Sequence, residues 1–458
     1  MDVILLFSMV IGFLLLGIPI AVALGLSSML FLLWFSDSSL ASIAQTLFSA
    51  FEGHYTLLAI PFFVLASSFM STGGVARRII RFSIACVGHF HGGLAIAGVF
   101  ACMIFAALSG SSPATVVAIG TIAISGMRQA GYSKEFAAGV ICNAGTLGIL
   151  IPPSIVMVVY AAAVEVSVGR MFLAGVLPGL TAGIMLMVSI YVVARLTDLP
   201  KGNWAGWKEI AESGREAGWG IFLVVIILGG IYGGVFTPTE AAAVAAVYAW
   251  AIACFVYRDM GPLAAEGAGE RFGLRHKPGA LLAALWHRDT RTTLYEAGML
   301  TVVLLFVISN ALILKHVLTD EQVPQKITEA MLAVGLGPIT FLIVVNLILL
   351  VGGQFMEPSG LLVIVAPLVF PIAIELGIDP IHLGIIMVVN MEIGMITPPV
   401  GLNLFVTSGV AGMPVMKVVT AALPFLAVLF MFLILVTYVP WLSTVLPNAL
   451  MGPEIVTR

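Results

Sequence analysis

The chain has 458 residues, of which 60% are hydrophobic and 9% are charged, and its formal net charge is −3. A soluble domain carries about a quarter charged residues, so this composition excludes an ordinary soluble domain. The near-neutral charge also offers no basic footprint for nucleic acid. Apolar stretches of roughly 20 residues recur along the chain, each long enough to cross a bilayer as a helix. The sequence therefore predicts an all-α polytopic membrane protein that sits in a lipid bilayer and binds no nucleic acid.

The first membrane half is expected to cover residues 1–257. Its predicted spans lie near residues 3–35, 55–76, 90–108, 135–163, 170–195, 218–236 and 239–257. Between the third and fourth spans lies an apolar stretch, 109–127, that opens with Ser, Gly and Pro residues. Gly and Pro interrupt helices, so we expect this stretch to be a re-entrant helical hairpin. The span after it contains a pair of prolines and predicts a broken helix near 145–153.

The least apolar part of the chain, residues 258–292, separates the two halves. It contains several Arg and Lys residues among Asp and Glu. Basic residues mark cytoplasmic loops of membrane proteins. We therefore expect a cytoplasmic linker between the repeats.

The second membrane half, residues 293–458, repeats the order of the first. Its predicted spans lie near residues 297–317, 337–353, 380–396, 398–412 and 420–446. The stretch 358–376 contains three prolines and predicts a second re-entrant hairpin. A further proline pair predicts a broken helix near 390–403.

The two proline pairs occur in matching apolar surroundings. The first copy runs from Gly148 to Pro152 and Pro153, and the second runs from Gly394 to Pro398 and Pro399. The offset is 398 − 152 = 246 residues. Proline frees carbonyls of the preceding turn, and in hydrocarbon these must be satisfied within the protein or face a cavity. Broken segments in corresponding halves point to the binding site of a transporter built from two inverted repeats.

The strongest polar cluster within apolar sequence is the run from Ser109 through Gly110 and Ser111 to Ser112. Its hydroxyls and exposed carbonyls suit a small hard cation such as Na⁺, and N–H groups at a following helix start suit a carboxylate. The alternative is a serine-lined contact between packed helices.

Further polar residues flank the proline pairs. Asn143 and Thr146 precede the first pair, Asn390 precedes the second, and Thr397 and Asn403 accompany it. Such residues often serve only as hydrogen-bonding contacts between membrane helices, so the functional interpretation rests on their repetition around the breaks. The 246-residue offset also places Glu357 opposite Ser111. A carboxylate there favours a role with a cation, and a solvated hairpin end is the alternative. Glu392 is the other acidic residue of the second half expected to lie at membrane depth, where carboxylates are costly and usually functional.

No motif of a known enzyme class is present: the sequence contains no HExxH, Walker A or GxSxG pattern. We therefore expect the chain not to be an enzyme, and we expect an ion gradient to drive transport. The alternative from another functional class is a structural membrane scaffold or an intramembrane enzyme.

Several of these motifs together resemble one family, the large membrane subunit (DctM-like) of TRAP, or tripartite ATP-independent periplasmic, transporters. The resemblance runs through nearly the whole chain. Its most specific segments are Ala107–Thr115, Gly145–Ser154, Gly377–Pro380, Gly384–Asn390 and Thr397–Phe405.

The resemblance implies a Na⁺-coupled symporter of the bacterial inner membrane that imports an organic acid, such as a C4-dicarboxylate or sialic acid, by an elevator mechanism. It implies two partners: a small four-span membrane subunit (DctQ-like) and a periplasmic substrate-binding protein (DctP-like). A self-sufficient ion-coupled carboxylate transporter that needs no binding protein is the alternative. Uptake by the chain alone would favour that alternative.

The resemblance also implies at least two bound Na⁺ ions, held near the hairpin tips and the broken helices. Their expected ligands are Ser109, Gly110, Ser111, Ser112, Gly145, Gly148 and Pro152 in the first half, and Glu357, Gly394, Thr397 and Pro398 in the second. The carboxylate substrate is expected to contact Ser109, Ser111, Ser112, Asn143, Thr146, Pro153, Asn390, Pro399 and Asn403. Family members often have an Asp followed by a hydroxyl residue where this chain has Glu357, Pro358 and Ser359.

Overall fold

The computed structural model describes residues 2–35, 45, 55–71, 74–264, 279–322, 325–326, 329 and 337–452. Its named elements are all helical, and the one β-bridge between described residues is the isolated pair His91 and Lys201. Among the described residues, six helices or continuous helix runs are long and apolar enough to cross a membrane. In hydrocarbon a helix satisfies its backbone hydrogen bonds within itself. The predicted all-α membrane fold is confirmed.

Along the described residues of the first half, α-helices follow one another, with a short helix at the first break. They are α1 (Asp2–Leu15), α2 (Ile20–Phe35), α4 (Ala59–Met70), α5 (Gly74–Val87), α6 (Gly93–Ser109), α7 (Ser112–Gln129), α8 (Lys134–Thr146), the short helix η2 (Leu147–Ile149), α9 (Ile155–Val164), α10 (Val168–Leu196), α11 (Gly206–Val224), α12 (Gly230–Tyr232) and α13 (Pro238–Ala251). The second half contains α14 (Ala280–Trp286), α15 (Arg288–Asp320), α17 (Pro338–Gly353), α18 (Pro358–Glu375), α19 (Pro380–Gly394), α20 (Leu402–Ala411), α21 (Val415–Tyr438) and α22 (Trp441–Met451).

Each repeat contains a helical hairpin, and both hairpins differ from the predicted bounds. The stretch 109–127 does not fold back on itself: α6 and α7 are the two arms, and the chain turns at Gly110 and Ser111. The stretch 358–376 is the single helix α18, which pairs with α17. The reason is the position of the first proline in each stretch. Proline is tolerated in the first helical turn, where its missing N–H has no partner to lose, so Pro113 and Pro358 begin these helices. Pro367 and Pro371 lie inside α18 and do not end it.

Two further predictions differ from the described helices. The expected span 3–35 is divided into α1 and α2, and Gly17, with φ 79°, and Pro19 lie at the division. The helix α15 begins at Arg288, inside the stretch expected to be the linker. Residues 265–278 of that linker lie outside the described residues. A cytoplasmic position for the linker stays a prediction.

The broken helices lie at the centre of the molecule. The chain leaves α8 at Thr146, passes through η2 and resumes helix at Ile155. It leaves α19 at Gly394 and resumes at Leu402. The hairpin helix α7 packs against α20 of the other repeat, and α18 packs against α9. This reciprocal packing is that of two repeats related by a pseudo-two-fold axis.

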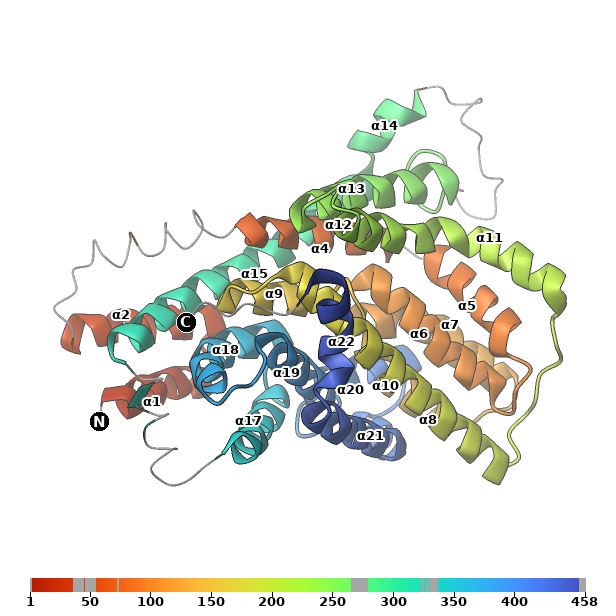
Figure 1. Cartoon of the computed structure of the whole chain (residues 1–458). Helices are drawn as coiled ribbons and strands as arrows, with labels where there is room; N and C mark the ends of the chain where they lie inside the picture. Colours follow the sequence, from red (N-terminus) through yellow and green to blue (C-terminus); the bar gives the residue numbers. More distant parts are fainter. Residues whose placement is uncertain are drawn as a thin grey trace.

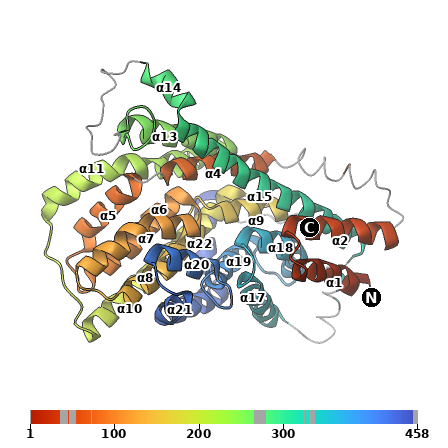
Figure 2. The ribbon, with the colours of Figure 1, turned by 180° about the vertical axis from the view of Figure 1, so that it is seen from behind.

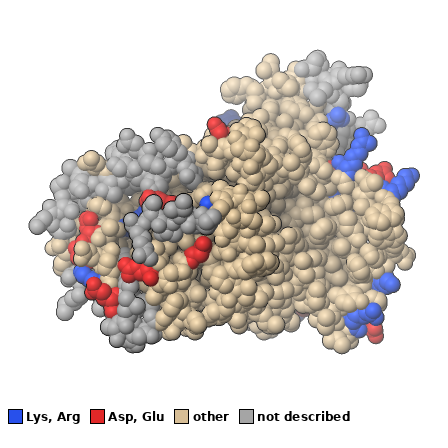
Figure 3. All heavy atoms as spheres, in the orientation of Figure 1, with Lys and Arg blue, Asp and Glu red and all other residues tan. Residues whose placement is uncertain are grey.

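A layer of helices lies across the repeats in both ribbon views (Figures 1 and 2). It contains α4, α13 and α15, and α11 extends it toward α5. In the space-filling view, charged side chains gather toward two opposite ends, with a broad tan area between them (Figure 3). A band without charge suits a bilayer.

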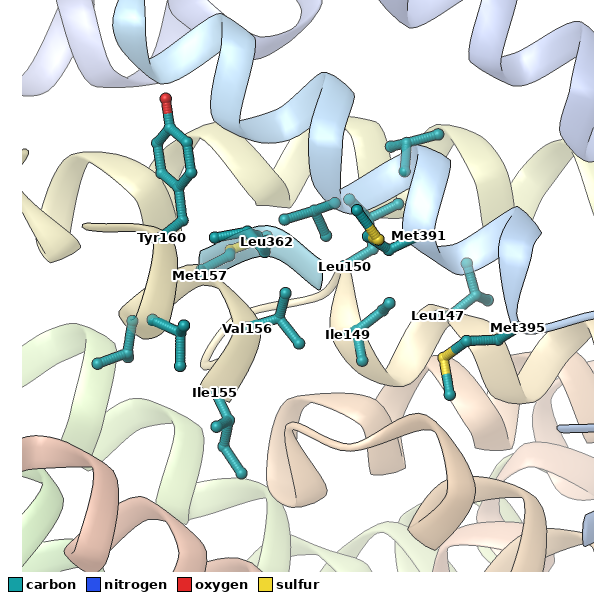
Figure 4. Packing of buried hydrophobic residues seen from close by; sticks show 14 of the residues in the cluster. Leu147, Ile149, Leu150, Ile155, Val156, Met157, Tyr160, Leu362, Met391 and Met395 are labelled. Atoms are coloured by element: carbon teal, nitrogen blue, oxygen red, sulfur yellow. The ribbon is translucent and has the colours of Figure 1, made fainter. Parts of the chain in front are cut away.

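The apolar core is continuous with the helix breaks. Leu147 and Leu150 from the first break and Met391 from α19 are fully buried, and Leu362 of α18 packs in the same cluster (Figure 4). The first break is therefore enclosed by packing, whereas Pro398, Pro399 and Val400 of the second break are exposed.

Candidate functional site

The tip of the first hairpin is an oxygen-rich turn. The hydroxyl oxygens of Ser109 and Thr115 lie 2.8 Å apart. Both lie within hydrogen-bonding distance of the Ser111 carbonyl oxygen, at 3.2 Å from Ser109 Oγ and 2.9 Å from Thr115 Oγ1. Gly110 permits the turn because its φ is 57°, and a Cβ there would lie 2.8 Å from the Pro153 carbonyl.

Ser112 connects this tip to both broken helices. Its hydroxyl donates to the Gly145 carbonyl oxygen at 2.9 Å, near the end of α8. It accepts a hydrogen bond from the Asn403 amide of α20. The Asn403 Oδ1 atom is buried and has no hydrogen-bond partner among the described residues. Three elements distant in the sequence thus meet at one hydroxyl.

The tip of the second hairpin is capped by a carboxylate. Glu357 is the N-cap of α18, where it accepts from the Ser359 hydroxyl at 3.0 Å and from the Gly360 N–H at 3.1 Å. Each tip also bonds to the start of its own repeat's second half-helix. Ile155 donates its N–H to the Gly110 carbonyl, and the N–H of Gly401, 246 residues later, donates to the Gln354 carbonyl.

Equivalent glycines let each hairpin approach its broken helix. A Cβ on Gly148 would lie 2.6 Å from the Ser111 carbonyl oxygen. A Cβ on Gly394 would lie 2.7 Å from the Gly353 Cα atom. Both distances are too short for any side chain, so glycine is required at both positions.

Both tips open onto one cavity of about 480 Å³. The polar side of its wall includes Gly110, Ser111, Ser112, Pro113, Glu357, Pro358, Ser359 and Gly360. The first residues of α9 and α20, Ile155 and Leu402, complete that side. The N-termini of α7, α9, α18 and α20 therefore border the same space. Helix N-termini carry partial positive charge, which favours an anion. At α18 the Glu357 carboxylate already takes this place, which leaves the N-termini of α7, α9 and α20 for a ligand.

The opposite wall of the cavity is apolar. It is made by α2 and α15, through Pro19, Ile20, Ala21, Leu300, Val303, Leu304, Val307 and Ile308. A second, more polar hollow of about 340 Å³ adjoins Ser111 and is lined by hydroxyls of α4 and by Thr293 and Glu296 of α15. The tips thus lie between the two repeats and the layer that crosses them.

Several predicted site residues do not line the cavity. Asn143 donates to the carbonyls of Gly139 and Ala422, and Asn390 donates to Asn346 of α17. Neither Asn is among the residues that line the cavity, and the same is true of Thr146, Gly145, Gly148, Pro152, Pro153, Gly394, Thr397, Pro398, Pro399, Asn403 and Ser109. These residues support the tips and the breaks, and of the predicted residues Gly110, Ser111, Ser112 and Glu357 line the cavity itself.

Sequence reasoning missed two features of the site and named a third only by its depth. Thr115 lies one helical turn after Ser111, and its hydroxyl completes the oxygen cluster at the tip. That spacing is a signal that was available in the sequence. Glu392 was expected at membrane depth without a partner, and the structure shows it fully buried and bonded to Thr146. The apolar wall from α2 and α15 carried no signal, because its residues resemble lipid-facing ones.

The donor atoms near the breaks fit a small cation that prefers oxygen. The cluster of Ser109, Ser111 and Thr115 contains hydroxyl and carbonyl oxygens, and the free Asn403 Oδ1 lies beside Ser112. The C-termini of α6 and α8 end close by, and helix C-termini favour positive charge.

Comparisons with known proteins agree with this geometry. A family described as "Tripartite ATP-independent periplasmic transporter, DctM component" matches residues 7–442. A "C4-dicarboxylate TRAP transporter large permease protein DctM" from Vibrio cholerae is 73% identical over 100% of both chains. A protein of the same description from Pseudomonas aeruginosa is 60% identical over 93% of this chain and 94% of its own length.

A solved structure shows a similar fold. It is the crystal structure of the Alcanivorax borkumensis YdaH transporter, described as revealing an unusual topology. It matches with a TM-score of 0.61 over 90% of both chains at 15% identity, which shows similarity of fold alone. The family match and the high sequence identity of the relatives establish the family of this chain. The chain belongs to the DctM component family of the tripartite ATP-independent periplasmic transporters.

Proposed function

We propose that this chain is the translocating subunit of a Na⁺-coupled importer of C4-dicarboxylates in the bacterial inner membrane. The observation that carries the proposal is the single cavity onto which both hairpin tips and four helix N-termini open. Inverted repeats with broken helices at one site are the general architecture of secondary transporters.

The substrate class rests on charge and on the relatives. A dicarboxylate carries two negative charges, and the N-termini of α7, α9 and α20 that border the cavity supply partial positive charge. Two relatives at 73% and 60% identity are described as C4-dicarboxylate permeases. The Ser111 hydroxyl would donate a hydrogen bond to a carboxylate from the cavity wall, whereas the hydroxyls of Ser112 and Ser359 already donate to Gly145 and Glu357.

Na⁺ would bind at the oxygen clusters beside the breaks. At the first tip its ligands would come from Ser109, Ser111 and Thr115, and Asn403 supplies a free oxygen nearby. At the second tip the Glu357 carboxylate is already oriented by Ser359 and Gly360. A bound Na⁺ offsets the negative charge of the substrate and links its binding to the Na⁺ gradient.

An elevator movement suits the two unlike walls of the cavity. The tips and the breaks are tied together by hydrogen bonds such as that from Asn403 to Ser112. The facing wall of α2 and α15 offers apolar side chains, along which such a unit can slide without losing hydrogen bonds. A small membrane subunit would extend the static layer, and a periplasmic binding protein would deliver the substrate.

Uptake of labelled succinate into proteoliposomes tests the proposal. The vesicles contain the chain and its small subunit, with or without the periplasmic protein, and with Na⁺ or K⁺ outside. We expect uptake only with an inward Na⁺ gradient and with the binding protein present. Equal uptake with K⁺ would contradict Na⁺ coupling, and full uptake without the binding protein would favour a self-sufficient transporter.

A further inference from the structure

The two broken helices touch at one repeat-equivalent pair of residues. Thr146 Oγ1 lies 2.6 Å from Glu392 Oε1, and the two residues are 246 positions apart, the offset of the repeat. When the same position of two repeats is in contact, the pseudo-two-fold axis passes between the pair. The contact between Thr146 and Glu392 therefore lies at the axis.

The pair is unlike in chemistry and fully buried. Both side chains are 0% exposed. Thr146 Oγ1 also lies 2.7 Å from the Asn143 carbonyl oxygen, so its single proton is shared between two acceptors. Glu392 Oε2 has no hydrogen-bond partner, and no Lys, Arg or His pairs with this carboxyl among the residues that the structure describes. A buried carboxyl with an unpartnered oxygen is costly, and at membrane depth it marks a functional group.

The same pair is adjacent in sequence to the contacts that hold both hairpins. Thr146 follows Gly145, whose carbonyl accepts the hydrogen bond from Ser112 at the first tip. Glu392 precedes Gly394, the glycine that packs on the second hairpin, by two residues.

We infer that the Glu392 carboxylate is the shared counter-charge for cations bound at both breaks, positioned on the repeat axis by Thr146. It ligates neither ion. It lowers the cost of placing two positive charges in one buried region, since opposite charges attract strongly in a medium of low dielectric constant. The inference rests on the proposed Na⁺ coupling, and it adds the group whose negative charge allows two Na⁺ ions to bind in the same buried region.

The test measures Na⁺ binding to the purified full chain, without uptake. A ligand that binds the folded state raises the melting temperature. The melting temperature is measured over a series of NaCl concentrations, with choline chloride keeping the ionic strength constant. The Na⁺ concentration at half of the maximal rise, the midpoint, reports Na⁺ affinity. Glu392→Gln keeps the size of the side chain and removes its charge. We expect the midpoint to move to at least about tenfold higher Na⁺. Glu375→Gln, an exposed residue at the end of α18, is the matched control and should leave it unchanged.

Thr146→Ser separates charge from packing. It keeps the hydroxyl that positions the carboxylate and removes only a methyl group, so we expect the midpoint to stay within about twofold of the parent value. If Thr146→Ser shifts the midpoint as far as Glu392→Gln, the pair acts through its packing and the inference is wrong. An unchanged midpoint in Glu392→Gln also overturns it.

An exchange variant uses the symmetry directly and covers the case in which Glu392→Gln does not fold. Thr146→Glu combined with Glu392→Thr returns the carboxyl to the axis from the other repeat. We expect this double variant to have the same Na⁺ midpoint as the parent protein. If the double variant folds and its midpoint is shifted tenfold, a shared charge at the axis is contradicted. If the parent chain shows no Na⁺-specific rise, the proposed Na⁺ coupling itself fails, and the inference fails with it.

Discussion

At the scale of single residues, the site depends on hydroxyls and amides that join segments far apart in the sequence. Ser112 is the centre of this network, since it bonds to Gly145 of α8 and to Asn403 of α20. Ser112 and Asn403 are fully buried, and Gly145 lies in a buried turn of α8. Buried polar groups are costly when a partner is lost, so this small network fixes the tip relative to both breaks.

The substitution Ser112→Ala should lower the free energy of unfolding by about 1–3 kcal/mol, because the Asn403 amide and the Gly145 carbonyl lose a partner. The melting temperature of the purified chain measures this. Ser125→Ala, an exposed serine of the same helix, is the control and should stay within about 0.5 kcal/mol of the parent. Equal melting temperatures for the two variants would show that Ser112 does not stabilise the fold.

At the scale of elements, each repeat consists of a hairpin, a broken helix and a long helix that follows it. The caps repeat as well: Ser133 caps α8, and Asp379, 246 residues later, caps α19. Gly131 and Gly377, two residues before these caps, both have positive φ. The turns that enter the broken helices are thus built alike, although the polar residues at the two tips differ.

The close approach of α17 and α19 requires a glycine at 394. We expect Gly394→Ala to destabilise the chain by about 1–3 kcal/mol, because the added Cβ meets backbone atoms of Gly353 that cannot move aside. Gly409→Ala in α20 has open space around it and should be neutral or slightly stabilising, as Ala favours helix over Gly. Thermal unfolding compares the two. A Gly394→Ala protein as stable as the control would show that the hairpin is not held this closely.

At the scale of the whole molecule, the cavity lies between a polar wall from the repeats and an apolar wall from α2 and α15. The helix α15 packs along α2, α4 and α18 and so borders both parts. Its residues on one side face the cavity, whereas Val302 is exposed on its surface.

Filling the cavity should block transport without unfolding the protein. We expect Val307→Trp to lower succinate uptake at least about tenfold, since the larger ring occupies space that a ligand of this size needs. Val302→Trp, on the exposed side of the same helix, should transport normally. Uptake in proteoliposomes and melting temperature are measured for both. Normal uptake by Val307→Trp would place the substrate path elsewhere.

The sequence alone was enough for the class of the protein, the repeat and the position of its breaks. Composition and the lengths of apolar stretches are properties of the sequence itself, and a proline interrupts the helical turn in which it lies. Neither inference therefore depends on the tertiary structure. The serines from Ser109 to Ser112 were also identified this way, because polar residues stand out in apolar sequence.

Only the tertiary structure decided which of these residues meet. It placed Ser111, Ser112 and Glu357 on one cavity, left Asn143 and Asn390 outside its lining, and made α7 and α18 single arms of hairpins. It also supplied the apolar wall of α15, whose leucines and valines look in sequence like residues that face lipid. The reason is physical: local chemistry decides where a helix starts or breaks, whereas a binding site is formed by segments hundreds of residues apart, and their contacts depend on how the helices pack.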